Sequence, residues 1–533
     1  MNSRKKFILN TILPFIQQIA TIISGLILPR LFLETYGSAV NGLVNSVAQF
    51  LQVIAFLELG VGAVLQSSIY KPLADKDDVN LSRVMRSGNR FFRRLALILL
   101  IYVAVLFFLY PLVINKEFDW LFVVLLIAAM SIDSFAQYYF GIVDTKLLVA
   151  DQKIYLSTIL RIIAVVVNLG ISVLMIRLGA PVQLVKFLSS LIYLIRPIFI
   201  AIYVKKNYKI DKKIEYTEEP IKQKWNGIAQ HVSSFILDGT DTIVLTVFTS
   251  LSVVSVYSVH NMVLLPMRQL MLSSLNGIEP LMGEKYAKND KQALKTMFSA
   301  TEWIINMLSI FAFGCTAMLI VPFISVYTNG INDAEYFQPI FAGIITIAQA
   351  FYCLRLPYSI LIQIAGRFKE TQWCYIIGAI LNLGISVIAV FFLGLIGVAI
   401  GTLIAMLFQT VWMAIYCYKN IVERKIIYFI KQLLTTVVCG VAIYFSTFWI
   451  VLGELTYLSW FIMAIKVAAI VFAVTLGINV LFYFKNFKSL IKKIINRFSK
   501  NKPTLESTDT QNESTLTENN QITASDTKEE VKE

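Results

Sequence analysis

Apolar stretches long enough to cross a membrane recur along almost the whole chain, and they limit its fold more than any other feature. A helix that crosses a hydrocarbon core of ~30 Å needs about 20 apolar residues, and about fourteen such stretches follow one another between residues 7 and 483. Only 15% of the 533 residues are charged, against about 25% in soluble domains. The sequence therefore predicts an all-α, polytopic membrane protein with about fourteen transmembrane helices.

The basic residues orient these predicted spans. Lys and Arg gather in every second connection and after the last span, whereas connections such as 327–338 and 453–459 carry almost none. Cytoplasmic loops of membrane proteins carry such an excess, so we expect both termini to be cytoplasmic. The formal net charge of +14 is therefore a topology signal, and we expect no nucleic-acid partner.

A long internal repeat divides the spans into two sets. Residues 147–173 and 361–387 both end on Asn-Leu-Gly-Ile-Ser-Val, which begins at Asn168 and at Asn382, an offset of 214 residues (382 − 168). The same offset brings Val40-Asn41-Gly42-Leu43 onto Val254-Ser255-Val256-Tyr257. A period this long indicates a duplicated domain. Because each copy holds six spans, an even number, the copies are expected to be parallel repeats related by an axis along the membrane normal.

The repeat predicts two lobes and an appendix. The first lobe is expected at residues 1–204 and the second at 227–418, joined by the charged cytoplasmic linker 205–226. Two further spans lie within 432–483, outside the repeat. The five cysteines lie in or beside apolar spans and form no CxxC pair, so we expect free, packed thiols.

The chain changes character twice after the last span. Residues 485–502 are basic and carry apolar side chains at helical spacing. This pattern fits a helix lying on an anionic inner leaflet and equally fits ordinary positive-inside flanking. Residues 503–533 consist largely of Ser, Thr, Asn, Glu and Asp, which predicts a disordered cytoplasmic tail.

Polar side chains form stripes on four of the predicted spans. Spans one (7–33) and two (40–66) correspond to seven (227–249) and eight (253–280) under the 214-residue offset. The stripes consist of Asn10, Gln17, Thr21 and Ser24; Asn41, Asn45, Gln49 and Gln52; Gln230, Ser234, Asp238 and Asp241; and Ser258, Asn261 and Arg268. Such residues often only join helices, but their coincidence on four related helices favours a hydrated cleft between the lobes.

Charged side chains at membrane depth are a sharper signal, because each costs ~2.5–3.5 kcal/mol at a helix centre. The deep charges are Arg30, Arg161, Arg196, Arg268, Arg355, Lys466, Glu58, Asp133, Asp238, Asp241 and Glu302. Pairing between opposite charges is one explanation. The other is function: unpaired arginines would bind an anionic cargo such as a diphosphate, beside the amides of Gln17, Asn45 and Asn261. The acids Glu58, Asp133, Asp238 and Asp241 would bind H⁺ or Na⁺ for coupling; we expect no other cofactor and no metal site.

Motifs of known enzymes are missing from the sequence. It contains no Walker A, HExxH or GxSxG pattern and no Cys/His cluster of metal-ligand type. The longest predicted outward connection has about a dozen residues, whereas membrane glycosyltransferases and polymerases need larger extracytoplasmic loops. The sequence therefore favours a transporter over an enzyme.

Several local sequences, in their order along the chain, resemble a known family. They are Leu-Pro-Arg-Leu-Phe-Leu-Glu-Thr-Tyr-Gly at 28–37, Glu-Leu-Gly-Val-Gly at 58–62, the turn at 70–78, and the loops 150–153 and 365–369 before the two Asn-Leu-Gly helices. Together with the arrangement of six, six and two spans, they resemble the polysaccharide-biosynthesis flippases of the multidrug/oligosaccharidyl-lipid/polysaccharide exporter superfamily. The resemblance covers nearly all of residues 1–484.

This resemblance implies a V-shaped, alternating-access transporter in the cytoplasmic membrane of a bacterium, with a cationic cavity lined mainly by spans one, two, seven and eight. Its cargo would be an undecaprenyl-diphosphate-linked oligosaccharide repeat unit, moved outward for capsule, exopolysaccharide or O-antigen synthesis. Arg30 and Arg268, with Arg161 or Arg355, would hold the diphosphate or acidic sugars, and the lipid tail would lie in a groove beside the lobe. Membrane lipids would surround the protein, and a polymerase and glycosyltransferases of the same pathway would be its partners.

Two alternatives stay open. An ion-coupled multidrug exporter of the same superfamily fits less well with deep basic residues that outnumber the acids and with two spans beyond twelve. A membrane polymerase, or a scaffold that recruits synthesis enzymes through its tail, belongs to a different class. Relative to the flippases of this superfamily that carry the peptidoglycan precursor lipid II, span one holds a single deep arginine, Arg30, and the resemblance to that branch is correspondingly weaker.

Overall fold

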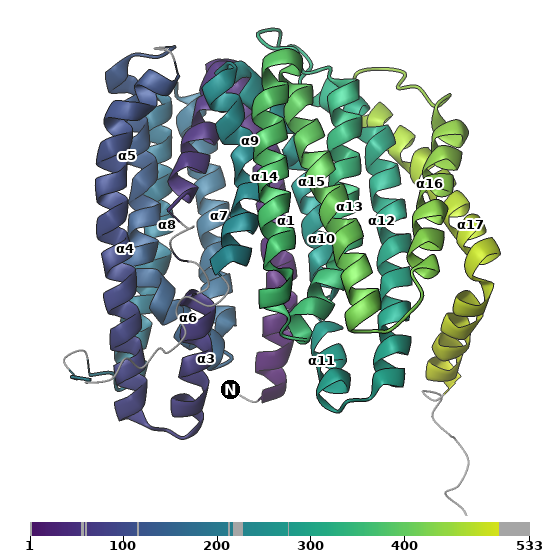
Figure 1. Cartoon of the computed structure of the whole chain (residues 1–533). Coiled ribbons are helices and arrows are strands. Elements are labelled where there is room, and N and C mark those ends of the chain that lie inside the picture. Colours follow the sequence, from purple (N-terminus) through teal and green to yellow (C-terminus); the bar gives the residue numbers. More distant parts are fainter. Residues whose placement is uncertain are drawn as a thin grey trace, which may run out of the picture. The chain divides into compact units, whose positions relative to one another are not determined.

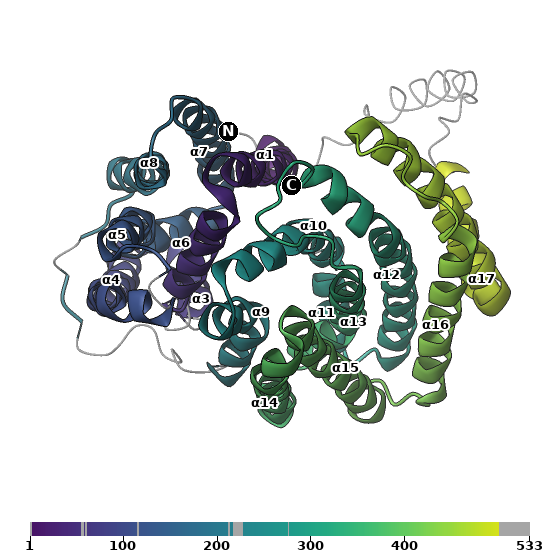
Figure 2. The same ribbon diagram turned by 90° about the horizontal axis from the view of Figure 1, so that it is seen from above.

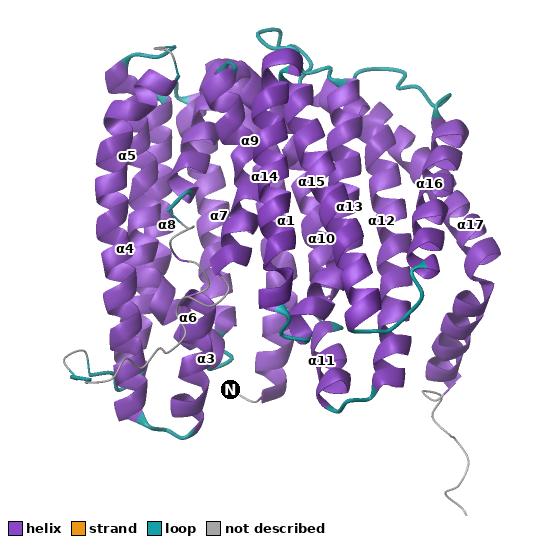
Figure 3. Ribbon diagram, viewed as in Figure 1, coloured by secondary structure: helices purple, strands orange, loops and turns teal. Residues whose placement is uncertain are grey.

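The computed structural model describes residues 3–54, 58, 61–114, 117–211, 214–216, 228–275 and 277–499, and every regular element in them is a helix (Figure 3). The prediction of an all-α membrane protein is thereby confirmed. Eleven helices in these ranges are long and apolar enough to cross a membrane. A bilayer favours this outcome, because a helix satisfies all its backbone hydrogen bonds internally.

The first half of the chain corresponds to the first six predicted spans (Figure 1). Its elements are α1 (Ser3–Gln52), α3 (Val61–Ala74), α4 (Asp78–Val113), α5 (Trp120–Ala136), η1 (Gln137–Gly141), α6 (Ile142–Ala150), α7 (Ile154–Arg177) and α8 (Val182–Asn207). Spans one and two are joined in α1 across a kink at Gly37, whose φ of 83° suits glycine. Span two is interrupted between Gln52 and Val61, and span four contains the short π-helix η1. Neither irregularity was predicted.

The second half supplies the other eight spans. Its elements are α9 (Ile228–Phe248), α10 (Leu251–Leu275), α11 (Glu279–Ala287), α12 (Lys291–Tyr327), α13 (Pro339–Ile364), α14 (Phe368–Leu393), α15 (Leu395–Asn420), α16 (Ile427–Thr447) and α17 (Tyr457–Ser499). The helix α11, which precedes the ninth span, is an addition to the predicted pattern. Residues Met1–Thr475 form one compact unit, and a second begins at Leu476, within α17. The predicted tail at 503–533 lies outside the described residues.

Within the unit Met1–Thr475, the helices gather around separate cores. Helices α3 to α8 share one apolar core, whereas α9, α10 and α12 to α15 surround others. In Figure 2 these groups lie on opposite sides of α1, which packs against both α7 and α10. The helix α16 packs on α12 at the edge of the second group.

Residues related by the 214-residue offset meet at the junction of α1 and α10. The Asn41 amide donates a hydrogen bond of 2.7 Å to the hydroxyl of Ser255, its counterpart in the repeat. Direct contact between equivalent residues is expected where a pseudo-two-fold axis passes between two repeats. The backbones approach closely here, because a Cβ atom on Gly42 would lie 1.8 Å from the carbonyl oxygen of Leu251.

The two Asn-Leu-Gly motifs occupy equivalent places. Asn168 of α7 donates to the hydroxyl of Tyr193 on α8 at 3.4 Å, and Asn382 of α14 donates to the hydroxyl of Thr402 on α15 at 3.0 Å. Both asparagines are buried. In each copy the motif therefore joins the repeated helix to the helix that follows it, as polar residues commonly do between transmembrane helices.

The contact at Gly42 generates a stability prediction. The change Gly42→Ala introduces a methyl group against the backbone of Leu251, so α1 and α10 must separate. We expect a loss of about 1–3 kcal/mol, the usual cost of overpacking, seen as a lower unfolding temperature of the purified protein. Gly170→Ala is the matched control, because no atom lies within 4 Å of the place that its added methyl group would take. Equal melting of the two variants would contradict the close approach.

Candidate functional site

A polar cavity of about 300 Å³ lies where α1, α9, α10, α13 and α15 meet. Four spans of the predicted cleft contribute to it, since α1 holds spans one and two, and α9 and α10 are spans seven and eight. The polar side chains of its wall are Asn45, Gln49, Gln52, Asp241, Thr242, Ser258, Asn261, Arg268, Gln349 and Thr402. The cavity therefore brings together polar residues from both halves of the chain.

The candidate residues divide between the cavity and other places. Asn45, Asn261, Arg268 and Asp241 line it. The residues absent from its wall are Gln17, Arg30, Arg161, Arg355, Glu58 and Asp133. The side chain of Asp238 lies outside the described part of the chain. Helical periodicity grouped Asn45, Asn261 and Arg268 on the faces that line this cavity, whereas the span-one stripe of α1 lies outside it. Periodicity does not tell how far along each helix the cavity extends.

Two amide oxygens near the cavity are buried and accept no hydrogen bond within the described residues: Asn261 Oδ1 and Gln349 Oε1. Both residues line the cavity. A buried acceptor without a partner is costly, and such atoms in a cavity wall are available to a hydroxyl or amide of a ligand. Gln349 lies on α13, which carries no predicted stripe, so sequence reasoning missed it.

Two arginines contact the same aromatic ring at the edge of this site. The guanidinium carbon of Arg268 lies 4.4 Å from the centroid of the Tyr352 ring, and that of Arg355 lies 4.7 Å from the same centroid. Such contacts stabilise a cation in a site with little water. Arg355 is buried, and within the described residues its Nε and Nη1 donate to no acceptor. The ring of Tyr352 therefore keeps two positive charges near one another.

An oxygen-rich cluster surrounds Asp241 beside the cavity. Its carboxylate accepts hydrogen bonds from the hydroxyls of Tyr257 (2.9 Å) and Thr402 (2.7 Å). Thr402 in turn accepts from Asn382, whose amide oxygen accepts from Thr240 at 3.0 Å. The cluster joins α9, α10, α14 and α15. The described residues contain no group of three or more His, Cys, Asp or Glu side chains that suits a metal ion.

The two candidate coupling acids of the first half, Glu58 and Asp133, lie at or near a second, smaller cavity of about 190 Å³. Glu58, Gln137, Lys146 and Arg196 line it, next to the π-helix η1. Asp133 also lies near, 3.5 Å from the Gln137 amide. π-Helical turns often mark functional positions, but here opposite charges lie close enough to compensate one another.

Arg161 belongs to the same charged group. It acts electrostatically on Asp133 together with Arg196, and Arg196 donates to the hydroxyl of Ser157 at 3.0 Å. Neither arginine lines the cavity beside α10.

Arg30 joins α1 to the connection between α12 and α13. Its Nε lies 2.7 Å from the carboxylate of Glu34, and its Nη atoms donate to the carbonyl oxygens of Tyr327 and Asn329. In this conformation its hydrogen-bonding capacity is used between protein groups. The expectation that it binds cargo therefore stays a prediction that needs another conformation.

Further polar contacts continue from Arg30 along α1. The Ser38 amide and hydroxyl donate to the two carboxylate oxygens of Asp333 at 2.7 and 2.5 Å, and the hydroxyls of Ser46 and Thr246 lie 2.7 Å apart. We call this set, Arg30, Ser38 and Ser46 with Asn329, Asp333 and Thr246, the outer contact, because 327–338 is a predicted extracytoplasmic connection. It holds α1 against the second half of the chain.

Glu302 illustrates the pairing explanation for deep charges. Its buried carboxylate accepts from the hydroxyls of Tyr358 (2.5 Å) and Tyr418 (2.6 Å), and Arg424 lies 3.0 Å away. These groups tie α12 to α13, α15 and the connection that leads into α16. A buried charge with such partners is stable in lipid, so Glu302 has a structural role.

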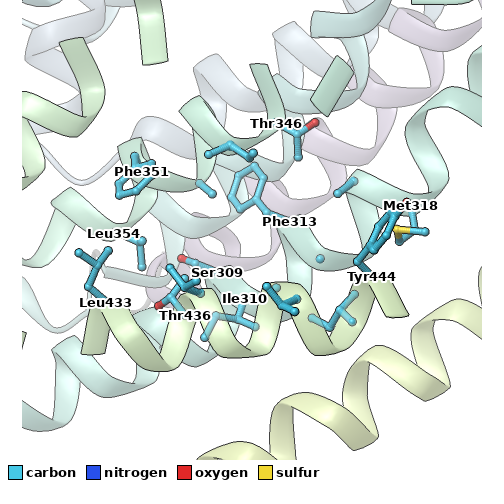
Figure 4. Close-up of a pocket in the computed structure, with 18 residues that line it drawn as sticks. Ser309, Ile310, Phe313, Met318, Thr346, Phe351, Leu354, Leu433, Thr436 and Tyr444 are labelled. Carbon is cyan, nitrogen blue, oxygen red and sulfur yellow. The ribbon is translucent and has the colours of Figure 1, made fainter. Parts of the chain in front are cut away.

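An apolar groove of about 410 Å³ lies between α12, α13 and α16 (Figure 4). Its wall consists almost entirely of hydrocarbon groups, among them Phe313, Met318, Phe351, Leu354, Leu433 and Tyr444. The few hydroxyls in it belong to Ser309, Thr346, Thr436 and Tyr444. The predicted appendix beyond the repeat thus supplies one wall of a groove.

Comparison with solved structures identifies the fold. A structure titled lipid II flippase MurJ, inward closed conformation, superposes with a TM-score of 0.68 at 16% identity, over 90% of this chain and 99% of that one. The MATE multidrug transporter DinF-BH gives 0.59 at 13% identity, over 77% and 95%. An inward-facing MATE transporter of the MOP superfamily gives 0.56 at 16% identity, over 76% and 97%. No protein-family model and no curated protein matches the sequence. The chain is a polytopic membrane protein with the fold of the MOP superfamily.

Proposed function

We propose that the chain is a flippase that moves a lipid-linked oligosaccharide, carried on a polyprenyl diphosphate such as undecaprenyl diphosphate, from the inner to the outer leaflet of the cytoplasmic membrane. The observation that carries this proposal concerns α13. Gln349 of α13 lines the polar cavity, and the next two residues, Ala350 and Phe351, line the apolar groove. One helix therefore separates a polar site from an apolar one, as an amphiphilic cargo requires.

The polar cavity suits the head of such a cargo. Sugar hydroxyls donate and accept hydrogen bonds, and the wall offers amides and hydroxyls, including the unpaired oxygens of Asn261 and Gln349. A diphosphate needs positive charge in fixed positions. Arg268 in the wall and Arg355, which shares the ring of Tyr352 with it, would supply this charge, and guanidinium groups bind phosphate oxygens in pairs.

The groove suits the tail. A polyprenyl chain is hydrocarbon and gains ~25 cal/mol per Å² of apolar surface removed from water, so it needs an apolar path open to the side rather than an aqueous one. The wall between α12, α13 and α16 is of this kind. The cargo's head would occupy the cavity while its tail lies in the groove.

Translocation requires the outer contact to open. While Ser38 and Ser46 are bonded to Asp333 and Thr246, a head group in the cavity has no path outward on this side. Alternating access then consists of breaking these bonds and opening the other side. Coupling would come from H⁺ or Na⁺ at Asp241, because a carboxylate and several neutral oxygens meet there. The ion would favour one of the two arrangements of α9 against α14 and α15.

The physiological cargo would be a repeat unit for capsule, exopolysaccharide or O-antigen, passed on to a polymerase after glycosyltransferases have built it. A multidrug exporter of the same superfamily is the alternative, and it would transport organic cations. The positive charge of Arg268 would attract an anionic head group and repel a cationic drug. A variant without this charge therefore distinguishes the two functions.

The first test removes the charge of Arg268. We expect Arg268→Gln to lower the rate at which reconstituted vesicles translocate a fluorescent polyprenyl-diphosphate oligosaccharide by about tenfold or more, because a hydrogen bond to a charged group contributes about 1.5–3 kcal/mol. The matched control is Arg177→Gln, which removes an exposed arginine at the end of α7. Unchanged lipid transport in Arg268→Gln, or faster efflux of a cationic dye with no lipid transport in the wild type, would overturn the proposal.

The second test fills the groove. Gly440 lines it, and no atom lies within 4 Å of the position of a Cβ there. Gly440→Leu should therefore fold normally and reduce transport of the long-chain substrate at least several-fold, while a soluble diphosphate sugar without a tail binds as before. Gly170→Leu is the matched control, because it adds the same side chain at another open glycine. Equal transport by both variants would exclude the groove as the tail path.

The third test locks the outer contact. The hydroxyl oxygens of Ser46 and Thr246 lie 2.7 Å apart, close to the ~2 Å that separates two bonded sulfurs. Ser46→Cys with Thr246→Cys, in a chain whose five native cysteines are replaced, should form a disulfide under oxidation and stop transport. A thiol reductant should restore it. Each single cysteine variant serves as control, and full transport by the oxidised pair would show that this contact does not open during the cycle.

A further inference from the structure

A cationic hollow of about 400 Å³ lies on the first half of the chain, away from the polar cavity and the apolar groove. Four arginines of α4 form its wall: Arg86, Arg90, Arg93 and Arg94. Ile210 and Asp211, from the segment that follows α8, close its other side. The hollow therefore carries four positive charges and one negative charge before anything binds.

The arginines of this hollow differ in their contacts with the rest of the protein. Arg86 donates to the carbonyl oxygen of Ile214 and so holds the interlobe linker (205–226) at this residue. Arg93 lies over the ring of Tyr139, 5.0 Å from its centroid. No ion pair among the described residues includes Arg90 or Arg94, and both are exposed. The positive-inside rule explains why basic residues occur at this end of α4. It does not explain why they enclose a hollow.

The level of the hollow relative to the membrane follows from the side chains that come next on the same face of α4. Directly after Arg94, the same face presents the exposed apolar side chains of Leu97, Ile101, Val105, Phe108 and Leu112. At 1.5 Å per residue, this apolar face extends for ~22 Å, most of a hydrocarbon core of ~30 Å. Arg94 therefore lies about one turn, and Arg90 about two turns, outside the core. That is the level of the phosphate groups of the cytoplasmic leaflet.

We propose that this hollow is a binding site for the phosphate of an anionic phospholipid of the inner leaflet, separate from the cargo site. Charge complementarity selects an anion, and guanidinium groups bind phosphate oxygens as paired donors. The apolar face beginning at Leu97 continues from the hollow, so the acyl chains of the same lipid can lie along α4. Because Arg86 also holds Ile214, the bound lipid would adjoin the linker between the two predicted lobes.

The experiment measures lipid binding to the purified full-length protein by native mass spectrometry. Phosphatidylglycerol and phosphatidylcholine with the same acyl chains are added separately, and inorganic phosphate is added in a third series. We expect the wild type to prefer phosphatidylglycerol. The double variant Arg90→Gln/Arg94→Gln should bind phosphatidylglycerol with at least about tenfold lower affinity, since each arginine near an anionic surface contributes about one factor of five.

Controls separate this site from general charge and from the proposed function. Lys71→Gln/Arg83→Gln removes two exposed cytoplasmic charges that do not line the hollow, and it should bind phosphatidylglycerol as the wild type does. Arg268→Gln, altered only in the cargo cavity, should also retain this binding. Equal binding by the wild type and the Arg90/Arg94 variant would refute the site. Displacement of the lipid by millimolar inorganic phosphate would overturn its assignment to a lipid and indicate a soluble phosphate ligand.

Discussion

The constraint on which the whole structure depends is that lipid offers no hydrogen bonds. Every backbone amide and carbonyl in the core must be satisfied within the protein, so every regular element in the described part of the chain is a helix. Every polar side chain that remains inside must also be accounted for, because each unpaired charge or amide costs free energy. Sorting these side chains by their partners therefore separates the residues that hold the fold from those that are available to a ligand.

Most of the charged side chains at membrane depth have partners within the protein, and this pairing accounts for them without a ligand. Glu302 is surrounded by two tyrosine hydroxyls and Arg424, and Arg30 is bonded to Glu34 and to carbonyl oxygens. Arg355 is different, since its contact is the face of Tyr352, which Arg268 shares. Two guanidinium groups at one ring concentrate positive charge beside the polar cavity, which is the physical reason to propose an anionic cargo at this point.

Sequence reasoning could predict those parts that depend on periodicity. The spacing of three and four residues assigned Asn45 to the polar face of span two, and Asn261 and Arg268 to the polar face of span eight; all three line the cavity. The 214-residue offset related Asn41 to Ser255, and these two residues form a hydrogen bond. It could not predict depth or partners. Arg30 and Arg268 look alike in sequence, but only the packing of the 327–338 connection shows that Arg30 is engaged. Gln349 and Tyr352 are isolated polar residues on an apolar helix, so no pattern singles them out.

The same constraint bears on α16, the first of the two spans outside the repeat, under the proposed function. A transporter of water-soluble cargo needs only a polar cavity between two six-helix lobes, and the repeat alone can form one. A cargo with a long hydrocarbon tail must keep that tail in an apolar medium while its head crosses. The helix α16 adds an apolar wall to α12 and α13, and α13 places the groove one residue away from the cavity. Under the proposed function, α16 of the appendix and the polar stripes, which look unrelated in the sequence, would serve the two ends of one cargo molecule.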